Sequence, residues 1–331
     1  MIGLSLLLAI AAATPFGEPP SEKGVSLGLF ASDPTYDYDH LLAEIRQTGA
    51  THISLVWVWW QNDVSSTTIR PKTGWSATKQ QVERTVAQAK QRGFHVTAFP
   101  IVRLVQAEPG EWRGKINPKN EDAWWESYFE YIAHTAAIAE QSGAQRLVIG
   151  SELVSRERMR KRWLRLIERI RLRHPKLELM YSANWDHYKP VQFWDAVDHV
   201  GITGYWEVGR YNTGSLEQLR QAWAPILKEL RTWSEKLGRS IIITEIGYPS
   251  LESGTKFPWD ETRKEKLDLE IQELGYQAAA YSFSNQNFLG GLYWWNWFGF
   301  GGKEDRNYTP RNKPAAEIIK SWYLGLEHEH R

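Results

Sequence analysis

Two glutamates stand at the ends of strand-like runs, where carboxyl groups can act as an acid and a nucleophile. Glu152 follows the run RLVIGS, and Glu245 follows the run IIIT. An unpaired carboxylate is costly to bury, so an acidic residue at the end of a core strand requires a reason. Hydrolysis of a glycosidic bond supplies one, because one carboxyl group protonates the leaving oxygen while a second attacks or assists. Each glutamate alone could equally pair with a nearby Arg or Lys, or lie solvated on a rim.

Aromatic and polar side chains gather at the ends of other strand-like runs. A sugar ring packs its apolar face against an aromatic plane and offers hydroxyls to Arg, Asn and Tyr, so this mixture is typical of a carbohydrate cleft. The candidates for substrate binding are Trp59, Trp60, Arg103, Asn184, Trp185, Tyr205, Trp206, Tyr248, Trp295 and Trp297. Because the chain holds 18 Trp and 14 Tyr, some of these rings must belong to the core.

Eight short runs rich in apolar, β-branched and aromatic residues alternate with segments of helical period from Val25 onward. This alternation predicts repeated βα units on a parallel sheet. The runs cover residues 25–30, 52–60, 95–103, 146–153, 177–185, 199–206, 240–248 and 290–297. Eight units close a barrel, in which the carboxyl ends of all strands meet on one face. Glu152 and Glu245 should therefore face each other across that end.

The alternative architecture is a doubly wound open sheet. It would need a glycine-rich phosphate turn after the first strand, and the segment LFASDPTYD has none. The fifth unit is the weakest, since only PVQFWDAVD is left for its helix. We expect Asp186 to cap this helix, although it could also form a second acidic site. The sequence thus predicts one α/β domain, a (β/α)8 TIM barrel over residues 24–325.

The strand-end motifs together resemble glycoside hydrolase family 113, in the large clan A of retaining (β/α)8 glycosidases. The matching segments are VIGSELVS, MYSANWD, GITGYW, ITEIGYPS, GLYWWNWF and TPRNKPA, in this order over nearly the whole chain. The family is known for endo-acting β-1,4-mannanases. The resemblance implies that Glu152 is the acid/base and Glu245 the nucleophile of a double displacement.

The resemblance also implies roles for five neighbours of the glutamates. Tyr205 would donate a hydrogen bond that keeps Glu245 ionised, and Trp295 would form the floor under the sugar beside the cleaved bond. The residues expected to line adjacent subsites are Asn184, Trp185 and Arg103.

Ser151 departs from the pattern of the clan. Many members have an asparagine directly before the acid/base, where its amide contacts the sugar's 2-hydroxyl, and a serine hydroxyl is too short to do so without water. The expected function is hydrolysis of β-1,4-mannan or glucomannan. Two alternatives stay open, a carbohydrate-binding barrel without useful turnover and a clan A hydrolase of another β-glycan.

Composition excludes several other classes. A formal net charge of +1 gives no overall attraction to nucleic acid, and the basic stretch 155–174 is expected to turn its arginines to solvent. With no cysteine and no HxxxH spacing we expect neither a metal nor another cofactor, and the expected partner is a polysaccharide or oligosaccharide. The apolar run from Leu4 to Ala13 predicts a signal peptide within residues 1–20, hence a secreted or periplasmic protein without membrane insertion; the alternative is a disordered amino terminus on a cytoplasmic chain. Residues 326–331 are expected to form a tail.

Overall fold

The computed structural model describes residues 16–209 and 214–326. The apolar run from Leu4 to Ala13, on which the predicted signal peptide rests, lies outside the described residues, as do residues 327–331 of the predicted tail. Within the described part of the chain, no helix is both long and apolar enough to cross a membrane.

Eight parallel strands form a closed barrel, as the sequence predicted. They are β1 (Glu22–Gly28), β2 (His52–Gln61), β4 (His95–Leu104), β5 (Arg146–Ser151), β6 (Glu178–Ala183), β7 (His199–Thr203), β8 (Ile241–Ile246) and β9 (Leu289–Trp294). The ring closes because β1 pairs in parallel with both β2 and β9. A two-residue strand, β3 (Ile69–Arg70), pairs antiparallel with the end of β2. Each of the eight predicted runs overlaps one barrel strand.

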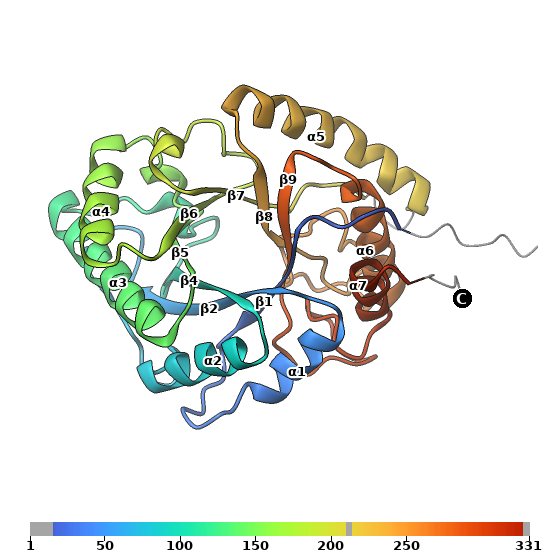
Figure 1. The fold of residues 1–331 in the computed structure, drawn as a ribbon, viewed down its shortest axis with the longest axis horizontal. Helices are drawn as coiled ribbons and strands as arrows, with labels where there is room; N and C mark the ends of the chain where they lie inside the picture. Colours follow the sequence, from blue (N-terminus) through green and yellow to red (C-terminus); the bar gives the residue numbers. More distant parts are fainter. Residues whose placement is uncertain (1–15, 210–213, 327–331) are drawn as a thin grey trace, which may run out of the picture.

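Helices surround the barrel, as Figure 1 shows. They are α1 (Asp39–Gln47), α2 (Lys79–Gln91), α3 (Glu121–Ser142), α4 (Arg160–Arg173), α5 (Leu216–Leu237), α6 (Leu269–Phe283) and α7 (Pro314–Leu324). Left-handed glycines end two of the long helices, Gly143 after α3 and Gly238 after α5, where a residue with a Cβ would be strained.

The unit between β6 and β7 carries no α-helix. Its 15 residues, 184–198, are irregular apart from a single 3-10 turn, Trp194–Ala196, which agrees with the weak helical signal of PVQFWDAVD. Asp186 therefore does not cap a helix, contrary to expectation. It instead accepts a hydrogen bond from the side-chain amide of Asn184 (2.5 Å).

Alternation along the strands divides the apolar residues into two layers. Leu55 and Trp57 of β2 pack outward in the large layer beneath the helices, while Val56 and Val58 point into the barrel. The interior cluster continues with Phe99 from the next strand along the ring. The barrel is thus filled by side chains and can hold residues rigidly at its carboxyl end.

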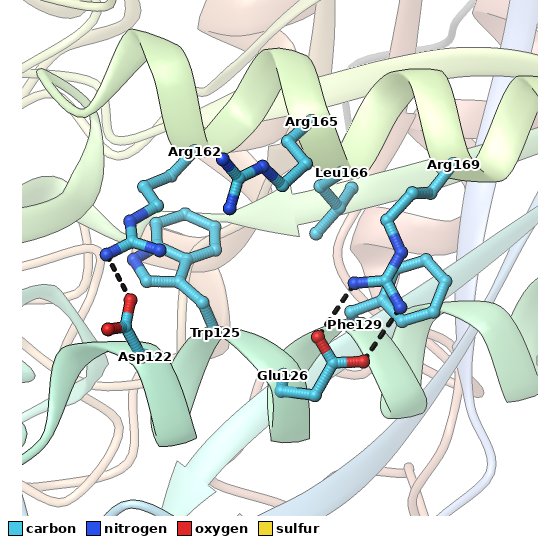
Figure 2. A pocket seen from close by; sticks show the side chains of 8 residues that line it. All are labelled: Asp122, Trp125, Glu126, Phe129, Arg162, Arg165, Leu166 and Arg169. Atoms are coloured by element: carbon cyan, nitrogen blue, oxygen red, sulfur yellow. Dashed lines mark hydrogen bonds and ion pairs between the residues drawn. The ribbon is translucent and has the colours of Figure 1, made fainter.

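The basic helix α4 packs against α3, and four of its six arginines form ion pairs. Figure 2 shows the hollow between the two helices, in which Arg162 pairs with Asp122 and Arg169 binds both carboxylate oxygens of Glu126 (2.8 and 2.7 Å). The Arg169 guanidinium also lies 3.3 Å from the ring centre of Phe129. These contacts fasten one helix to the other and account for much of the positive charge in this stretch.

Candidate active site

A cleft of about 880 Å³ opens at the carboxyl end of the barrel. Its base is formed by side chains at or just after the ends of the strands, and its walls by the loops that follow them. The lining residues at the strand ends are Val58, Ile101, Arg103, Glu152, Asn184, Tyr205, Glu245 and Trp295. Strand-end residues from seven of the eight strands can therefore act on one ligand.

Glu245, the penultimate residue of β8, is almost fully buried at the base of the cleft. Its Oε2 accepts a hydrogen bond from the Tyr205 hydroxyl (3.0 Å), and its Oε1 has no partner among the described residues. Burial and, second to it, the nearby Glu152 raise the pKa of Glu245 to about 8, against the opposing influence of Arg113 and Tyr205. One oxygen of a positioned carboxyl group is thus left free to meet a substrate.

Glu152 follows the last residue of β5 and is also buried. Its backbone lies in the left-handed region (φ +52°), which costs a non-glycine residue ~1–3 kcal/mol and is held here by the surrounding structure. The Glu152 backbone N–H donates to the carbonyl of Ser182 on β6 (2.8 Å). Arg113, in the loop after β4, donates to its carboxylate (2.6 Å). In the free cleft the two glutamates therefore have different partners.

A buried hydrogen-bonded chain fixes the turn that carries Glu152. The backbone N–H of Leu153 donates to the Tyr181 hydroxyl (3.1 Å), which donates to Glu157 (2.9 Å). The other oxygen of Glu157 contacts Nδ1 of His187 (2.6 Å). Burial raises the pKa of Glu157, which is completely inaccessible to solvent, while His187 and Tyr181 oppose that rise.

Aromatic rings form much of the cleft wall. Trp185, after β6, stacks on Trp259 with ring centres 5.8 Å apart and an angle of 22°. Trp295 lies half-buried directly after β9. Phe300, in the loop beyond β9, is almost fully exposed at the cleft (96%). Flat apolar surfaces beside two carboxyl groups suit a sugar polymer.

Comparison with known families identifies this architecture. The sequence profile of Glycoside Hydrolase Family 113 matches residues 28–311. The chain belongs to glycoside hydrolase family 113. It is therefore a glycoside hydrolase. A comparison with curated proteins found no match.

Solved structures support the fold of this family 113 hydrolase. The GH113 β-mannanase AaManA from Alicyclobacillus acidocaldarius, in complex with ManMIm, is 20% identical with a TM-score of 0.81, over 94% of this chain and 98% of that one. A GH113 β-1,4-mannanase is 22% identical with a TM-score of 0.80, over 94% and 99% of the two chains. A β-D-glucuronidase of Dictyoglomus thermophilum is 14% identical with a TM-score of 0.62, over 96% of this chain and 52% of that one.

Besides Trp60, which does not line the cleft, the sequence suggested twelve residues for the site, and the family 113 cleft brings together seven of them. These are Arg103, Glu152, Asn184, Trp185, Tyr205, Glu245 and Trp295. They share one property, a position at or within two residues of a strand's end on the carboxyl side of the barrel.

The other five suggested residues have different environments. They are Trp59, Ser151, Trp206, Tyr248 and Trp297, none of which lines the cleft. Trp59 stacks on Tyr131 of α3 (4.6 Å, 14°), and Trp206 packs against Trp185 and Trp223.

Three of these five residues are fully buried. Trp297 donates from its indole nitrogen to Glu44 of α1 (2.9 Å), and Tyr248 packs beside Tyr276 of α6. The Ser151 hydroxyl is buried without a hydrogen-bond partner among the described residues. At positions such as Trp297 and Tyr248 the side chain points away from the barrel axis into the layer beneath the helices, so these two are core residues.

Sequence reasoning missed the part of the family 113 cleft that comes from loops. The missed lining residues include Trp112, Arg113, Trp259, Glu261, Phe298 and Phe300. Their segments have no periodicity, so a sequence pattern does not say which side chains turn inward. Within the described residues, no group of three or more His, Asp or Glu side chains is arranged to hold a metal ion.

Proposed function

We propose that this family 113 hydrolase cleaves internal β-1,4 links of mannan or glucomannan by double displacement. The observation that carries the proposal is a pair of buried glutamates at the ends of β5 and β8, in one aromatic cleft and with different partners. Two GH113 structures of similar fold are named as a β-mannanase and a β-1,4-mannanase.

Glu245 acts as the nucleophile in this proposal. Its unpartnered Oε1 attacks the anomeric carbon, the bond from that carbon to the leaving oxygen breaks, and a glycosyl ester forms. Tyr205 holds the other oxygen and so fixes the direction of attack. Trp295, half-buried beside the pair, supplies the flat surface beneath the reacting sugar.

Glu152 acts as the acid and then as the base. It gives a proton to the leaving oxygen in the first step and takes one from water in the second, when water attacks the ester and frees Glu245. Because the Glu245 charge disappears once the ester forms, Glu152 no longer faces a neighbouring anion when it acts as the base in the second step. The mechanism requires ~5–5.5 Å between the two carboxyl groups.

Release of reducing sugar tests this function. Purified protein is incubated with β-1,4-mannan, glucomannan and a panel of other β-glycans, beside its Glu245→Ala variant. We expect release from mannan by the wild type, a loss of at least about 10³-fold in the variant, and short oligosaccharides as early products of internal cleavage. Glu130→Ala, at a solvent-exposed ion pair on α3, is the matched control and should keep full activity.

Other outcomes separate the alternatives. Release of reducing sugar from another β-glycan but not from mannan would reject mannan as the substrate and would remain consistent with the proposed double displacement. Binding of mannan with no release from any glycan would instead favour a carbohydrate-binding barrel.

We further infer that the protein is exported, on the basis of the apolar run from Leu4 to Ala13. Expression of the full chain in a bacterial host, followed by mass spectrometry of the periplasmic or secreted product, tests this. A product that begins after residue 13 supports export, and an intact product confined to the cytoplasm contradicts it.

A further inference from the structure

Two arginines converge on the wall of the cleft beside Glu152. Arg103 lies near the end of β4, and Arg113 lies in the loop that follows the same strand. Among the described residues, Arg103 has no hydrogen bond and no ion pair. Its guanidinium lies 5.8 Å from the ring centre of Trp60. Arginine side chains in a substrate cleft bind carboxylates in a bidentate manner, and this one is not occupied by the protein.

The two guanidinium groups are close enough to repel one another. Burial and, after it, the Arg113 charge lower the pKa of Arg103, while Glu261 opposes that effect. Like charges that face one site are usually placed there for an anion that offsets them. Glu261 lines the cleft but forms no ion pair with Arg103.

The other acidic side chains of the cleft are engaged elsewhere. Asp186 accepts the amide of Asn184, and Asp305 pairs with the buried ammonium of Lys313 (3.1 Å). Neither can neutralise the two arginines without giving up that partner. Arg103 is exposed at the cleft and has no ion pair among the described residues, so the carboxylate of a ligand can reach it.

Arg113 also forms an ion pair with the Glu152 carboxylate (2.6 Å), and this contact affects the proposed role of Glu152. A carboxylate held by a guanidinium is stabilised in its ionised form, whereas the acid of the first step must carry a proton. Arg113 must therefore release Glu152 before cleavage. Its Nε is buried and has no partner among the described residues, so the guanidinium still has a donor for a second acceptor.

We propose that the natural substrate is a β-1,4-linked glycan that carries uronic acids, whose carboxylate binds between Arg103 and Arg113. Binding draws Arg113 from Glu152 to the sugar carboxylate, which leaves Glu152 free to hold the proton for the leaving oxygen. A neutral mannan offers no such anion and is cleaved more slowly. This inference rests on the proposed function and narrows its substrate class.

The test compares one glycan in two charge states. The ligands are a β-1,4-manno-oligosaccharide and the same oligosaccharide partly oxidised at C6, so that some rings carry a carboxylate. Binding is measured by calorimetry with the Glu245→Gln variant, which cannot turn the ligand over. We expect the oxidised ligand to bind about tenfold more tightly at low salt, and this advantage to shrink as salt is added.

Variants assign the effect to the arginines. In the Glu245→Gln background, Arg103→Gln should remove most of the advantage of the oxidised ligand, and Arg103→Lys should retain part of it because the charge remains. Arg165→Gln is the matched control, since this arginine lines the hollow between α3 and α4 (Figure 2) and does not line the cleft. Equal binding of the two ligands, or an advantage that survives both Arg103→Gln and Arg113→Gln, overturns the inference.

Hydrolysis by the wild type separates this inference from the proposed function. Cleavage of neutral mannan with no preference for the oxidised ligand would support the proposed hydrolysis of mannan and reject the proposed uronate site. An arginine-dependent preference in binding, with no release from any glycan, would uphold the uronate site and reject the hydrolysis of mannan.

Discussion

Glu152 and Glu245 are residues of the same type, but they have different hydrogen-bond partners at this site. Glu245 shares a hydrogen bond with a neutral phenol, while Glu152 faces a guanidinium. In the free cleft, burial and the nearby Glu152 raise the pKa of Glu245 to about 8 although Tyr205 opposes this rise, whereas the proposed first step requires an ionised Glu245. Substrate binding must therefore rearrange the partners of both groups. The contacts of Tyr205 and Arg113 are therefore as important for the behaviour of this site as the glutamates themselves.

Tyr205→Phe should shift the pH dependence of cleavage. The Tyr205 hydroxyl lowers the pKa of Glu245, so its removal raises that pKa and leaves less nucleophile ionised at any given pH. We expect the acid limb of the kcat/KM profile to move to higher pH, and activity below neutral pH to fall by about tenfold or more. Rates of reducing-sugar release measured between pH 4 and pH 9 check this.

Tyr308→Phe provides the control for that measurement. Tyr308 is a buried tyrosine of the same cleft, but its hydroxyl donates to the backbone carbonyl of Pro258 (2.6 Å) and not to a carboxylate. Its removal should leave the acid limb in place. An unmoved limb in Tyr205→Phe, or equal shifts in the two variants, would contradict the role given to Tyr205.

The sequence located both glutamates and, through the family resemblance, Tyr205 as the partner of Glu245, but it did not indicate Arg113 as the partner of Glu152. Glu152 and Glu245 stood out because each ends a run of buried strand residues, where a carboxyl group is anomalous. Arg113 gave no such signal, since EWRGK is an irregular polar segment and its approach to Glu152 depends on a loop of a different βα unit. Trp297 was misplaced because a strand-end aromatic can face either the cleft or the helices.

At the scale of elements, the ends of β5 and β6 are tied together by side chains behind the cleft. Tyr181 of β6 accepts from the backbone of Leu153 and donates to Glu157, both of which follow β5. This connection supports the left-handed turn at Glu152, whose strain would otherwise favour a different backbone path. The backbone turn at Glu152 is thus held by this buried chain as well as by the strands.

Tyr181→Phe should lower turnover more than its cost in stability explains. The substitution leaves the Leu153 N–H and the Glu157 carboxyl group without their partner, at a cost of ~1–3 kcal/mol. We expect the Glu152 turn to relax and kcat to fall by about tenfold, with a smaller change in KM. Thermal unfolding and steady-state kinetics on the same preparation provide the two readouts.

Tyr128→Phe is the matched control for the buried hydroxyl. Tyr128 of α3 is equally buried and donates to the carbonyl of Ile149 (2.7 Å), within β5 and not at its end. A similar loss of stability with nearly unchanged kcat is expected. If both variants lose kcat in proportion to their loss of stability, the chain behind Glu152 has no special part in positioning it.

The strands themselves were predictable from sequence, and one connection was not. Eight buried runs rich in β-branched and aromatic residues leave few alternatives to a parallel barrel, because both faces of each strand must be apolar. The segment after β6 lacked the length and period of a helix, and the structure indeed has a 3-10 turn there. Asp186 was expected at a helix start that does not exist, and it is bound by Asn184 instead.

At the scale of the whole molecule, the two ends of the barrel have different roles. The carboxyl end holds the cleft, whereas six charged or titratable residues begin their strands at the opposite end. They are Glu22, His52, His95, Arg146, Glu178 and His199. The buried Arg146 binds both oxygens of Glu22 (2.8 Å each) and so joins strands that lie across the ring. Polar contacts at this face of a barrel are typical of stability and not of catalysis.

The histidines of this end should make the fold sensitive to acid. Burial, followed by the Arg146 charge, lowers the pKa of His95 to about 4, and burial likewise lowers the pKa of His52 and of His199. A histidine whose folded-state pKa lies below its unfolded value of ~6.5 binds its proton more readily when unfolded, so acid favours unfolding. For His95 this contribution is present above about pH 6.5 and is lost as the pH falls toward 4. Glu22 adds to the loss at lower pH, because its pairing with Arg146 lowers its pKa despite burial.

Replacement of His95 by Gln isolates this effect. Glu245 opposes the loss of stability in acid, because a carboxyl group whose pKa is raised by folding stabilises the fold as the pH falls. The prediction therefore concerns the difference in Tm between the variant and the wild type, and not the Tm of the wild type alone. Between pH 7.5 and pH 5, we expect the Tm of wild type to fall by several degrees more than that of His95→Gln. His40→Gln, at an exposed ring on α1, should follow the wild type. Equal losses of Tm in wild type and His95→Gln would show that the amino end of the barrel is not what couples this fold to pH.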